Sequence, residues 1–438
     1  MTLTTNRREK ATLSPATIST LRSCLDSQTS GANPSIAGIS YCAVDRNGDF
    51  VFSHCSGTIG LGIPRPVTLD TVYWLASCTK LITGIACMQL AEQGKILLDD
   101  VDFVEGLSSE LRDVKVLVER ENGSFELVPK ERGITMRMLL THTSGFGYAF
   151  DSAKLRKWAG PVGLDDFGSK DECLYRPLLH QPGTAFEYGV GVDWAGVLVE
   201  RVTNMSLEQY CQEYIFKPIG IKNISFSPNS DMKSRLAYMH QRESSGTLRL
   251  SDHLYRAPLL QGSTAEATEG FCMGGCGCFG TITEYCQIIA AILNDGTSPK
   301  THAQILRPET ITEMFTDQIP NLPRYVNEYS DSAKPWLANP CGGPPIHNSN
   351  GNVEDDKTEG WGLTFSLSHT TSPIGRAASS ASWEGLPNIF WFADRENGVG
   401  GIIAAQILPY GDSKVLQCSA EIEKLIYSEL KKRVDPAP

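Results

Sequence analysis

The sequence lacks a surplus of positive charge. Its 39 Lys and Arg residues stand against 50 Asp and Glu residues, which leaves a formal net charge of −11 at pH 7 and a pI of about 5.3. A protein that binds nucleic acid or an anionic membrane surface needs a basic face, because it must replace the counterions of the phosphates. We therefore expect no nucleic acid and no membrane among the partners of this protein.

Long hydrophobic runs are also missing. No stretch approaches the roughly 18 apolar residues of a membrane-spanning helix, and the polar N-terminal sequence MTLTTNRREKATLSP lacks the apolar core of a signal peptide. The 13 cysteines are odd in number and spread from Cys24 to Cys418 without a tight framework. Because large secreted chains usually pair their cysteines, both observations predict a cytoplasmic protein.

Motifs that would indicate a metal or a cofactor are absent. Cys272, Cys276 and Cys278 form the densest cysteine group, but no second pair of cysteines or histidines follows at a zinc-binding distance. A G-x-G-x-x-G pattern at 275–280 is not framed by the strand–helix–strand unit that dinucleotide binding requires. The sequence contains no G-x-S-x-G elbow, no H-E-x-x-H pair and no Walker loop. We expect neither a metal nor an organic cofactor.

The order of the predicted elements indicates an α+β fold with an antiparallel sheet flanked by helices. β-rich runs lie near both ends of the chain, as a hairpin around Asn47-Gly48 and as strands within 388–408. The middle of the chain contains a second hairpin at Asn122-Gly123 and is otherwise mainly helical. Helices are expected at 14–30, Thr79–Gln93, Met136–Thr141, Trp194–Thr203, Leu207–Phe216 and 417–432.

This distribution predicts two lobes. Residues 1–105 and 266–438 would form one α/β lobe, into which 106–265 insert as a mainly helical lobe. Residues 335–360 are poor in large apolar groups and rich in Pro, Gly and Asn, so they predict a long loop. Such a loop is either a lid over a site or a solvated insertion.

The strongest chemical signal is the tetrapeptide Ser77-Cys78-Thr79-Lys80. An S-x-x-K pattern alone is weak, and a second one occurs at 230–233 in a polar context. At Ser77, however, the pattern opens an apolar helix, which puts Ser77 and Lys80 on one face. Burial and the positive end of the helix both lower the pKa of a lysine and favour the amine that can take a serine proton. The alternative, an N-capping serine with a solvated lysine, needs a polar helix face that this sequence lacks.

Three sequence blocks resemble the serine β-lactamase and penicillin-binding-protein superfamily, in the branch of class C β-lactamases and their esterase relatives. They are WLASCTKLITGIACMQLAEQGKILLDD at 74–100, LLTHTSGFGY at 139–148 and PGTAFEYGVGVDWAGVLVERVT at 182–203. The resemblance is closest to the fungal lovastatin-type acyltransferases of polyketide biosynthesis, which share CMGGCGCFG and LPNIFW. It implies a β-lactamase/transpeptidase-like fold.

The resemblance also implies roles for individual residues. It makes Ser77 the nucleophile, Lys80 its general base and Tyr188 the second proton-transfer group. A tyrosine hydroxyl beside a lysine amine can share a proton between nucleophile, leaving group and incoming alcohol. Without the resemblance, Tyr188 reads as an amphipathic core residue. His142, within LLTHTSG, is expected in a turn packed near the site and stays outside the catalytic set.

Departures from the β-lactamase pattern bear on the substrate. The third residue of the family's Y-x-N motif is Val190 here, and the motif of a basic residue, Thr or Ser, and Gly is replaced by Trp383-Glu384-Gly385-Leu386. An indole and a carboxylate thus stand where a cation and a hydroxyl would bind the carboxylate of a β-lactam. A neutral or hydrophobic ester or thioester is the better electrostatic match.

The same segment supplies the other expected site groups. The backbone N–H of Leu386 is expected to form the oxyanion hole with that of Ser77, since a main-chain donor survives side-chain change. The expected substrate pocket comprises Trp383, Glu384, Gly385 and Trp391.

We therefore predict a serine acyltransferase of secondary metabolism. Its partners would be an acyl thioester or ester donor, free or carried on an acyl carrier protein of a polyketide synthase, and a small polyketide-like hydroxyl acceptor. The alternative is an esterase or thioesterase that passes the same acyl-enzyme to water. A third alternative, from another class, is a non-catalytic scaffold that retains the fold.

Overall fold

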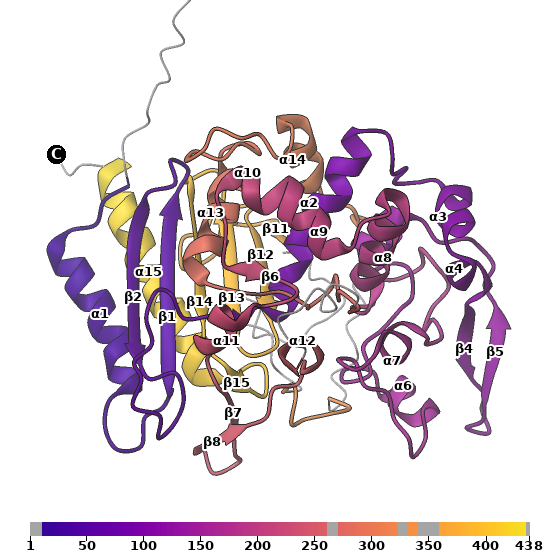
Figure 1. The fold of residues 1–438 in the computed structure, drawn as a ribbon, viewed down its shortest axis with the longest axis horizontal. Coiled ribbons are helices and arrows are strands. Elements are labelled where there is room, and N and C mark those ends of the chain that lie inside the picture. Colours follow the sequence, from indigo (N-terminus) through magenta and orange to yellow (C-terminus); the bar gives the residue numbers. More distant parts are fainter. Residues whose placement is uncertain (1–10, 261–269, 323–331, 340–358, 435–438) are drawn as a thin grey trace, which may run out of the picture.

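A computed structural model describes residues 11–260, 270–322, 332–339 and 359–434. Its centre is a seven-stranded antiparallel sheet in the order β10-β11-β12-β13-β14-β1-β2 (Figure 1). These strands span Gly38–Asp45 (β1), Phe50–Gly57 (β2), Glu359–Trp361 (β10), Ser366–Ser368 (β11), Ala381–Gly385 (β12), Ile389–Asp394 (β13) and Val399–Ala404 (β14). The predicted antiparallel sheet and the Asn47-Gly48 hairpin are confirmed.

The two ends of the chain meet in this sheet. β1 pairs with β14, with Ser40 opposite Ala404 and Asp45 opposite Val399. Helices α1 (Pro15–Thr29) and α15 (Ser413–Val434) pack against each other beside this part of the sheet. The sheet is therefore completed only by segments from opposite ends of the sequence.

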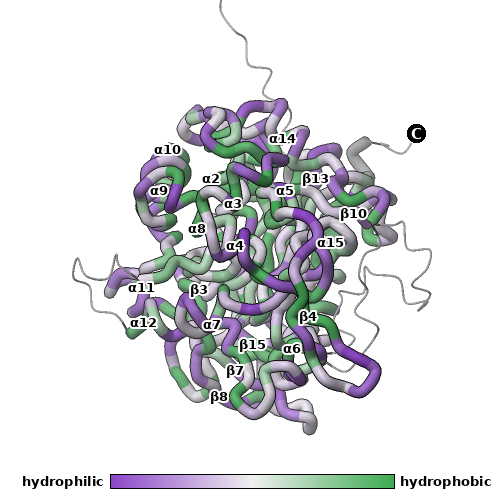
Figure 2. Tube along the Cα trace, turned by 90° about the vertical axis from the view of Figure 1, so that its right-hand side faces the viewer, coloured by the Kyte–Doolittle hydropathy of each residue, from purple (hydrophilic) through white to green (hydrophobic). Residues whose placement is uncertain are grey.

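Both faces of the sheet are covered, because successive side chains point to opposite faces. Phe390 and Phe392 of β13 join the hydrophobic cluster that contains α1 and α15. Trp391 and Ala393, between and after them, join the larger cluster that contains α2 (Thr79–Glu92) and α13 (Ile282–Leu293). Figure 2 shows the hydrophobic segments gathered inside and the hydrophilic ones toward the outer turns.

Helix α2 is buried from Thr79 to Leu90. Its sequence is apolar on nearly every side, which is typical of a helix enclosed on all faces. Gly94 follows the helix with φ +66, the left-handed conformation in which glycine commonly ends helices. The predicted helix at Thr79–Gln93 is confirmed to within one residue.

The remaining elements lie around this core, with α3, α4, α6, α7 and the β4–β5 hairpin on the side away from α1 (Figure 1). The other helices are α3 (Val101–Leu107), α4 (Ser109–Asp113), α5 (Met136–Leu140), α6 (Ala153–Trp158), α7 (Lys170–Leu174), α8 (Gly191–Thr203), α9 (Leu207–Cys211) with a π-helical turn at Gln212–Phe216, α10 (Lys217–Ile219), α11 (Ser230–Ser234), α12 (Ala257–Leu260) and α14 (Pro308–Met314). The other strands are β3 (Tyr73–Trp74), β4 (Lys115–Glu119), β5 (Phe125–Pro129), β6 (Ile224–Ser225), β7 (Met239–Arg242), β8 (Leu248–Ser251), β9 (Phe279–Gly280) and β15 (Ile407–Leu408).

Most predicted boundaries agree with these elements. The Asn122-Gly123 hairpin joins β4 to β5, whereas α8 begins at Gly191 and α15 at Ser413, each a few residues before its predicted start. The lobe boundaries at 105 and 265 stay a prediction. Most of the predicted 335–360 loop lies outside the described residues. Among the helices that the structure describes, none has the length and apolar character needed to cross a bilayer.

The close contact between Gly84 of α2 and Thr364 yields a stability prediction. A Cβ at Gly84 would lie 2.5 Å from Thr364 Oγ1, and Thr364 is held at φ +83. Gly84→Ala should therefore lower the free energy of unfolding by about 1–3 kcal/mol, as overpacked cores do, although helix propensity alone favours alanine. The measurement is the denaturant midpoint of unfolding.

Gly106→Ala is the matched control. Gly106 lies in α3 and is exposed, and a Cβ there would meet no atom within 4 Å. This variant should gain about 0.5–1 kcal/mol from helix propensity alone. Stabilisation in both variants would contradict the proposed contact with Thr364.

Candidate active site

Ser77 lies in a 3₁₀ turn, Ala76–Cys78, that connects β3 to α2. Ala76 adopts φ +44, a left-handed conformation that is strained for a residue with a side chain. Ala76 and Cys78 are buried, whereas Ser77 is partly exposed. The turn therefore presents one side chain, that of Ser77, at the start of a rigid buried helix.

Lys80 is fully buried and its amine has three neighbours. The Nζ atom lies 3.1 Å from Ser77 Oγ, 3.2 Å from the Tyr148 hydroxyl and 2.9 Å from the Gly275 carbonyl oxygen. Burial lowers the pKa of Lys80 to about 8, although the nearby Asp193 carboxylate acts in the opposite direction. The amine that can accept a proton is thus well populated at mildly alkaline pH.

Tyr188 completes the predicted group. Its hydroxyl donates a 2.7 Å hydrogen bond to Ser77 Oγ and accepts one of 3.2 Å from the Trp383 indole. Burial raises the pKa of Tyr188 well above its ordinary value. Since Tyr188 holds its proton and Lys80 releases one easily, Lys80 is the better base for Ser77. The structure therefore brings together Ser77, Lys80 and Tyr188.

Two further side chains of the site, Tyr148 and Asp193, were not predicted from the sequence. Tyr148 contacts Lys80 as described, and its hydroxyl donates to Asp193 Oδ2 at 3.4 Å. Asp193 also accepts a 2.8 Å hydrogen bond from the Gly275 N–H. Burial raises the pKa of Asp193, and the charge of Lys80 opposes that shift. The one feature of the sequence that could have indicated Asp193 is its position as an aspartate in an otherwise apolar run, which the structure buries from Gly191 to Val199 at the start of α8.

His142 packs against the site without joining the hydrogen bonds around Ser77. Its ring centroid lies 4.7 Å from that of Tyr188, and Nδ1 accepts a hydrogen bond from the Gly189 N–H at 3.3 Å. Burial lowers the pKa of His142 well below its ordinary value, so its ring is neutral. Among the described residues, its Nε2 atom has no hydrogen-bond partner. These contacts support a packing role for His142 beside Tyr188.

The end of β12 lies against the Ser77 turn. A Cβ at Gly385 would lie 2.7 Å from the Leu75 carbonyl oxygen and 3.5 Å from the Ala76 Cβ. This close approach requires glycine, and it brings the next residue, Leu386, to the same turn. The role of the Leu386 and Ser77 N–H groups as an oxyanion hole stays a prediction.

The expected pocket residues occupy different environments. Trp383 is partly exposed and donates a hydrogen bond to the Tyr188 hydroxyl, whereas the carboxylate of Glu384 accepts a hydrogen bond from the Tyr410 hydroxyl. Trp391 is buried, and its ring contacts are with Tyr285 and Phe365 at centroid distances of 6.2 and 6.0 Å. The role of Trp391 in a substrate pocket stays a prediction that these core contacts do not support.

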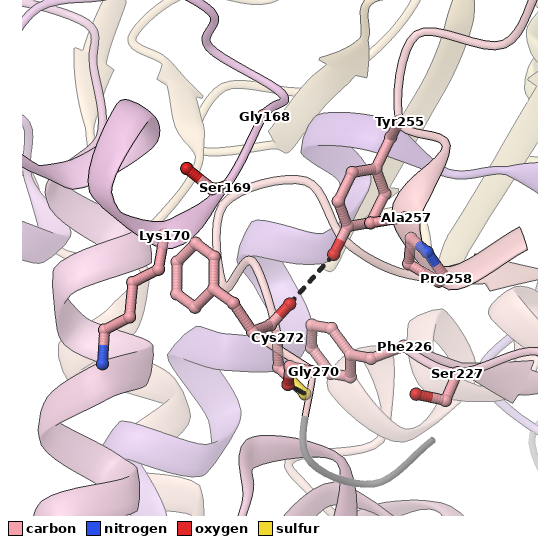
Figure 3. A pocket seen from close by; sticks show the side chains of 11 residues that line it. Gly168, Ser169, Lys170, Phe226, Ser227, Tyr255, Ala257, Pro258, Gly270 and Cys272 are labelled. Carbon is pink, nitrogen blue, oxygen red and sulfur yellow. Dashed lines mark hydrogen bonds between the residues drawn. The ribbon is translucent and has the colours of Figure 1, made fainter. Parts of the chain in front are cut away.

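A separate cavity of about 210 Å³ lies elsewhere in the molecule (Figure 3). It is lined by residues that include Lys170, Phe226, Tyr255 and Cys272. Within this lining, the Tyr255 hydroxyl donates a 3.0 Å hydrogen bond to the Phe271 carbonyl oxygen. Since none of Ser77, Lys80 and Tyr188 lines it, we do not assign this cavity to the acyl group.

No group of three His, Cys, Asp or Glu residues in the described part of the chain is arranged to hold a metal ion. The chemistry that Ser77, Lys80 and Tyr188 can perform is proton transfer and nucleophilic attack by Ser77.

Comparisons with known proteins find relatives along most of the chain. Residues 28–416 match the family model described as beta-lactamase. The chain is 32% identical to lovastatin esterase of Penicillium rubens, over 85% of this chain and 90% of that protein. It is 31% identical to monacolin J acid methylbutanoyltransferase of Aspergillus terreus, over 90% and 92%. A solved structure of a simvastatin synthase mutant from Aspergillus terreus superposes with a TM-score of 0.78 at 30% identity, covering 95% of each chain.

The lowered pKa of Lys80 generates a pH prediction. The rate at which a fluorophosphonate labels Ser77 should rise about tenfold per pH unit below pH 8 and level off above it, because only the neutral amine accepts the serine proton. Peptide mapping across a pH series measures both the site and the rate. A midpoint near the ordinary histidine value of about 6.5 would instead indicate a histidine base and contradict this assignment.

Proposed function

The chain belongs to the beta-lactamase family, and we propose that it is a serine acyltransferase in which Ser77 carries the acyl group from a thioester or ester donor to a hydroxyl of a small polyketide-like acceptor. The relatives confirm the predicted resemblance, and the solved structures confirm the β-lactamase/transpeptidase-like fold. The observation that carries the catalytic assignment is the hydrogen bonding of Ser77 Oγ to both Lys80 and Tyr188.

Acylation follows from these contacts. Neutral Lys80 takes the hydroxyl proton of Ser77, and Oγ attacks the carbonyl carbon of the donor. The oxyanion of the tetrahedral intermediate is stabilised by the N–H groups of Ser77 and Leu386. When the intermediate collapses, the bond to the leaving thiol or alcohol breaks, and that group takes the proton from Lys80 by way of Tyr188. The product is an ester of Ser77.

Deacylation reverses these roles. The acceptor hydroxyl gives its proton to the Lys80–Tyr188 pair as its oxygen attacks the acyl carbon. The bond between that carbon and Ser77 Oγ then breaks, and Oγ recovers a proton from the pair. The enzyme returns to its starting state, and a new ester leaves.

The side chains beside Tyr188 support an uncharged acyl donor. Trp383 packs against Trp361 with their ring centroids 4.5 Å apart, and its indole lies 5.0 Å from the Tyr188 ring. Glu384 follows Trp383 in the sequence, so an acidic group stands where the β-lactamase motif has a hydroxyl. The apolar surface of Trp383 and Trp361 beside Tyr188 favours neutral esters and thioesters over anionic lactams.

The acceptor class and the setting are also part of this proposal. The relative named monacolin J acid methylbutanoyltransferase supports a polyketide alcohol as the acceptor. Delivery of the donor by an acyl carrier protein and a cytoplasmic location complete the proposal.

Hydrolysis is the second candidate, and a specific observation favours it. The relative named lovastatin esterase is as similar to this chain as the transferase is. Both activities use the same acyl-enzyme, and they differ in whether water or an alcohol attacks it. A transferase must hold its alcohol in place, because well-oriented reactants reach effective molarities of about 10⁵ M or more.

The proton pathway is tested by single substitutions. Lys80→Ala and Tyr188→Phe should each lower turnover by at least about 10²-fold, the usual scale for a general acid or base. Circular dichroism should show little change in the fold. The second S-x-x-K pattern provides controls: Ser230→Ala and Lys233→Ala, in α11, should keep wild-type turnover. Near-normal turnover of the Lys80 or Tyr188 variant would remove that residue from the mechanism.

Transfer and hydrolysis are distinguished by the fate of the acyl-enzyme. An acyl thioester is supplied with and without a panel of polyketide alcohols, and both free acid and ester are measured. We expect ester to exceed acid with at least one alcohol, and Ser77→Ala to form neither. Rapid release of acid that no alcohol diverts would establish the hydrolase instead.

A further inference from the structure

We infer that Asp193 is a positioning residue that fixes the direction of the hydrogen bonds around Lys80, so that the amine presents its lone pair to the Ser77 hydroxyl. This inference rests on the proposed function, since it concerns how Ser77 becomes acylated. It is carried by one continuous chain of contacts that runs from Trp383 through Tyr188, Ser77, Lys80 and Tyr148 to Asp193.

The Trp383 end of this series of contacts can only donate a hydrogen bond. The Trp383 indole N–H has no acceptor capacity, so the Tyr188 oxygen must accept from it at 3.2 Å. The Tyr188 proton is then directed to Ser77 Oγ at 2.7 Å. Because Oγ already accepts this bond, its own proton is free to turn toward Lys80.

The Asp193 end of the series can only accept hydrogen bonds when the carboxylate is ionised. An ionised Asp193 carboxylate takes the N–H of Gly275 on Oδ1 at 2.8 Å and the hydroxyl proton of Tyr148 on Oδ2 at 3.4 Å. With its proton turned to Asp193, the Tyr148 oxygen can only accept from Lys80. The Gly275 carbonyl oxygen, on the residue whose N–H Asp193 holds, also accepts from Lys80.

The consequence for Lys80 follows from a count of its groups. A neutral amine has two N–H bonds and one lone pair. Two of its three neighbours, the Tyr148 hydroxyl and the Gly275 carbonyl, face it as acceptors and take the two N–H bonds. The lone pair is left for the third neighbour, Ser77, at 3.1 Å. Asp193 touches neither Ser77 nor the acyl group, and it acts through the two groups that orient the amine.

The packing around Asp193 allows little freedom. Asp193 is fully buried in the first turn of α8, and any Cβ at Gly275 would overlap its carboxylate. The charged and titratable groups that face Lys80 are Asp193, the hydroxyls of Tyr148 and Tyr188, the thiols of Cys78, Cys173 and Cys276, and the ring of His142. Burial raises the pKa of each of these thiols and both of these hydroxyls and lowers that of His142. Burial also raises the pKa of Asp193, but the charges of Lys80 and Arg176 and the hydrogen bonds from Gly275 and Tyr148 favour its ionised form.

The test is Asp193→Asn in the full-length enzyme. An asparagine can keep the Gly275 bond through its oxygen, but its NH₂ group then donates to Tyr148 and turns the Tyr148 proton toward Lys80. The lone pair would be drawn away from Ser77, so the plateau rate of acylation by p-nitrophenyl butyrate should fall about 10- to 100-fold with KM near the wild-type value. Loss of the negative charge should also move the midpoint of the pH–rate profile below that of the wild type.

Tyr148→Phe tests the same path from its middle. It removes one of the two acceptors and should lower the plateau rate to a similar extent. In the double variant, Asp193→Asn should add little to Tyr148→Phe, because both act on the same amine. Effects that multiply would show that Asp193 acts independently of Tyr148 and would overturn the inference. If the Asp193 variant does not fold, the Tyr148→Phe variant is sufficient as a test, because a wild-type plateau rate in that variant would overturn the inference.

The chain contains a matched control pair. Tyr427 and Asp394 are both buried, and the Tyr427 hydroxyl donates to Asp394 Oδ2 at 2.9 Å, in the cluster that contains α1 and α15. Tyr427→Phe and Asp394→Asn carry a comparable stability cost, and their rates and pH profiles should match the wild type.

Intact-protein mass spectrometry separates the two ways to fail. If the wild type forms no butyryl ester on Ser77, the proposed function itself is wrong and the inference falls with it. If the wild type forms this ester while Asp193→Asn keeps the wild-type plateau rate and midpoint, the inference alone is overturned.

Discussion

The exclusion of water from the Lys80 amine is the constraint on which the rest of the site depends. An ammonium group in an apolar interior loses its hydration, and this loss lowers its pKa toward the range in which it can act as a base. Such burial is costly unless the amine is fully hydrogen-bonded. The three oxygen neighbours of Nζ meet that requirement, and they also decide which way the amine faces. Reactivity and stability thus depend on the same contacts.

These contacts require distant parts of the sequence to meet at one point. The 3₁₀ turn before α2 carries the nucleophile, the loop at 142–148 and the start of α8 supply Tyr148 and Asp193, and the glycine-rich block around Gly275 supplies a backbone carbonyl. β12 adds Trp383 from the sheet. Small residues make these approaches possible, because Gly275 and Gly385 lie where a side chain would overlap Asp193 or the Leu75 carbonyl. A site built from five segments is rigid only when all five are packed.

The predictable part of this site was the part encoded locally. Ser77 and Lys80 are three residues apart on an apolar helix, and that spacing alone places them together. The two hairpins were readable because Asn-Gly turns are local as well. Tyr148 and Asp193 were missed because their link to Lys80 exists only in the tertiary structure, and no sequence pattern marks a backbone carbonyl such as that of Gly275. Trp383 was expected beside the substrate, and the structure shows in addition that it donates to Tyr188. The start of α8 was predicted too late because Gly191 and Val192 are weak helix formers.

The pairing of β1 with β14 has a consequence for synthesis of the protein. Ser40 leaves the ribosome long before its partner Ala404 is added to the chain. Until then the edge of β1 that pairs with β14 is open, and the apolar face of β1 that later contacts α13 is uncovered. Long-range pairing of this kind is slow because the entropy of closing the intervening loop is lost before any stabilising contact between the strands forms. The nucleophile helix is therefore made well before the strands that enclose it, so an active site arises only after the segment from β12 to β14 has been synthesised.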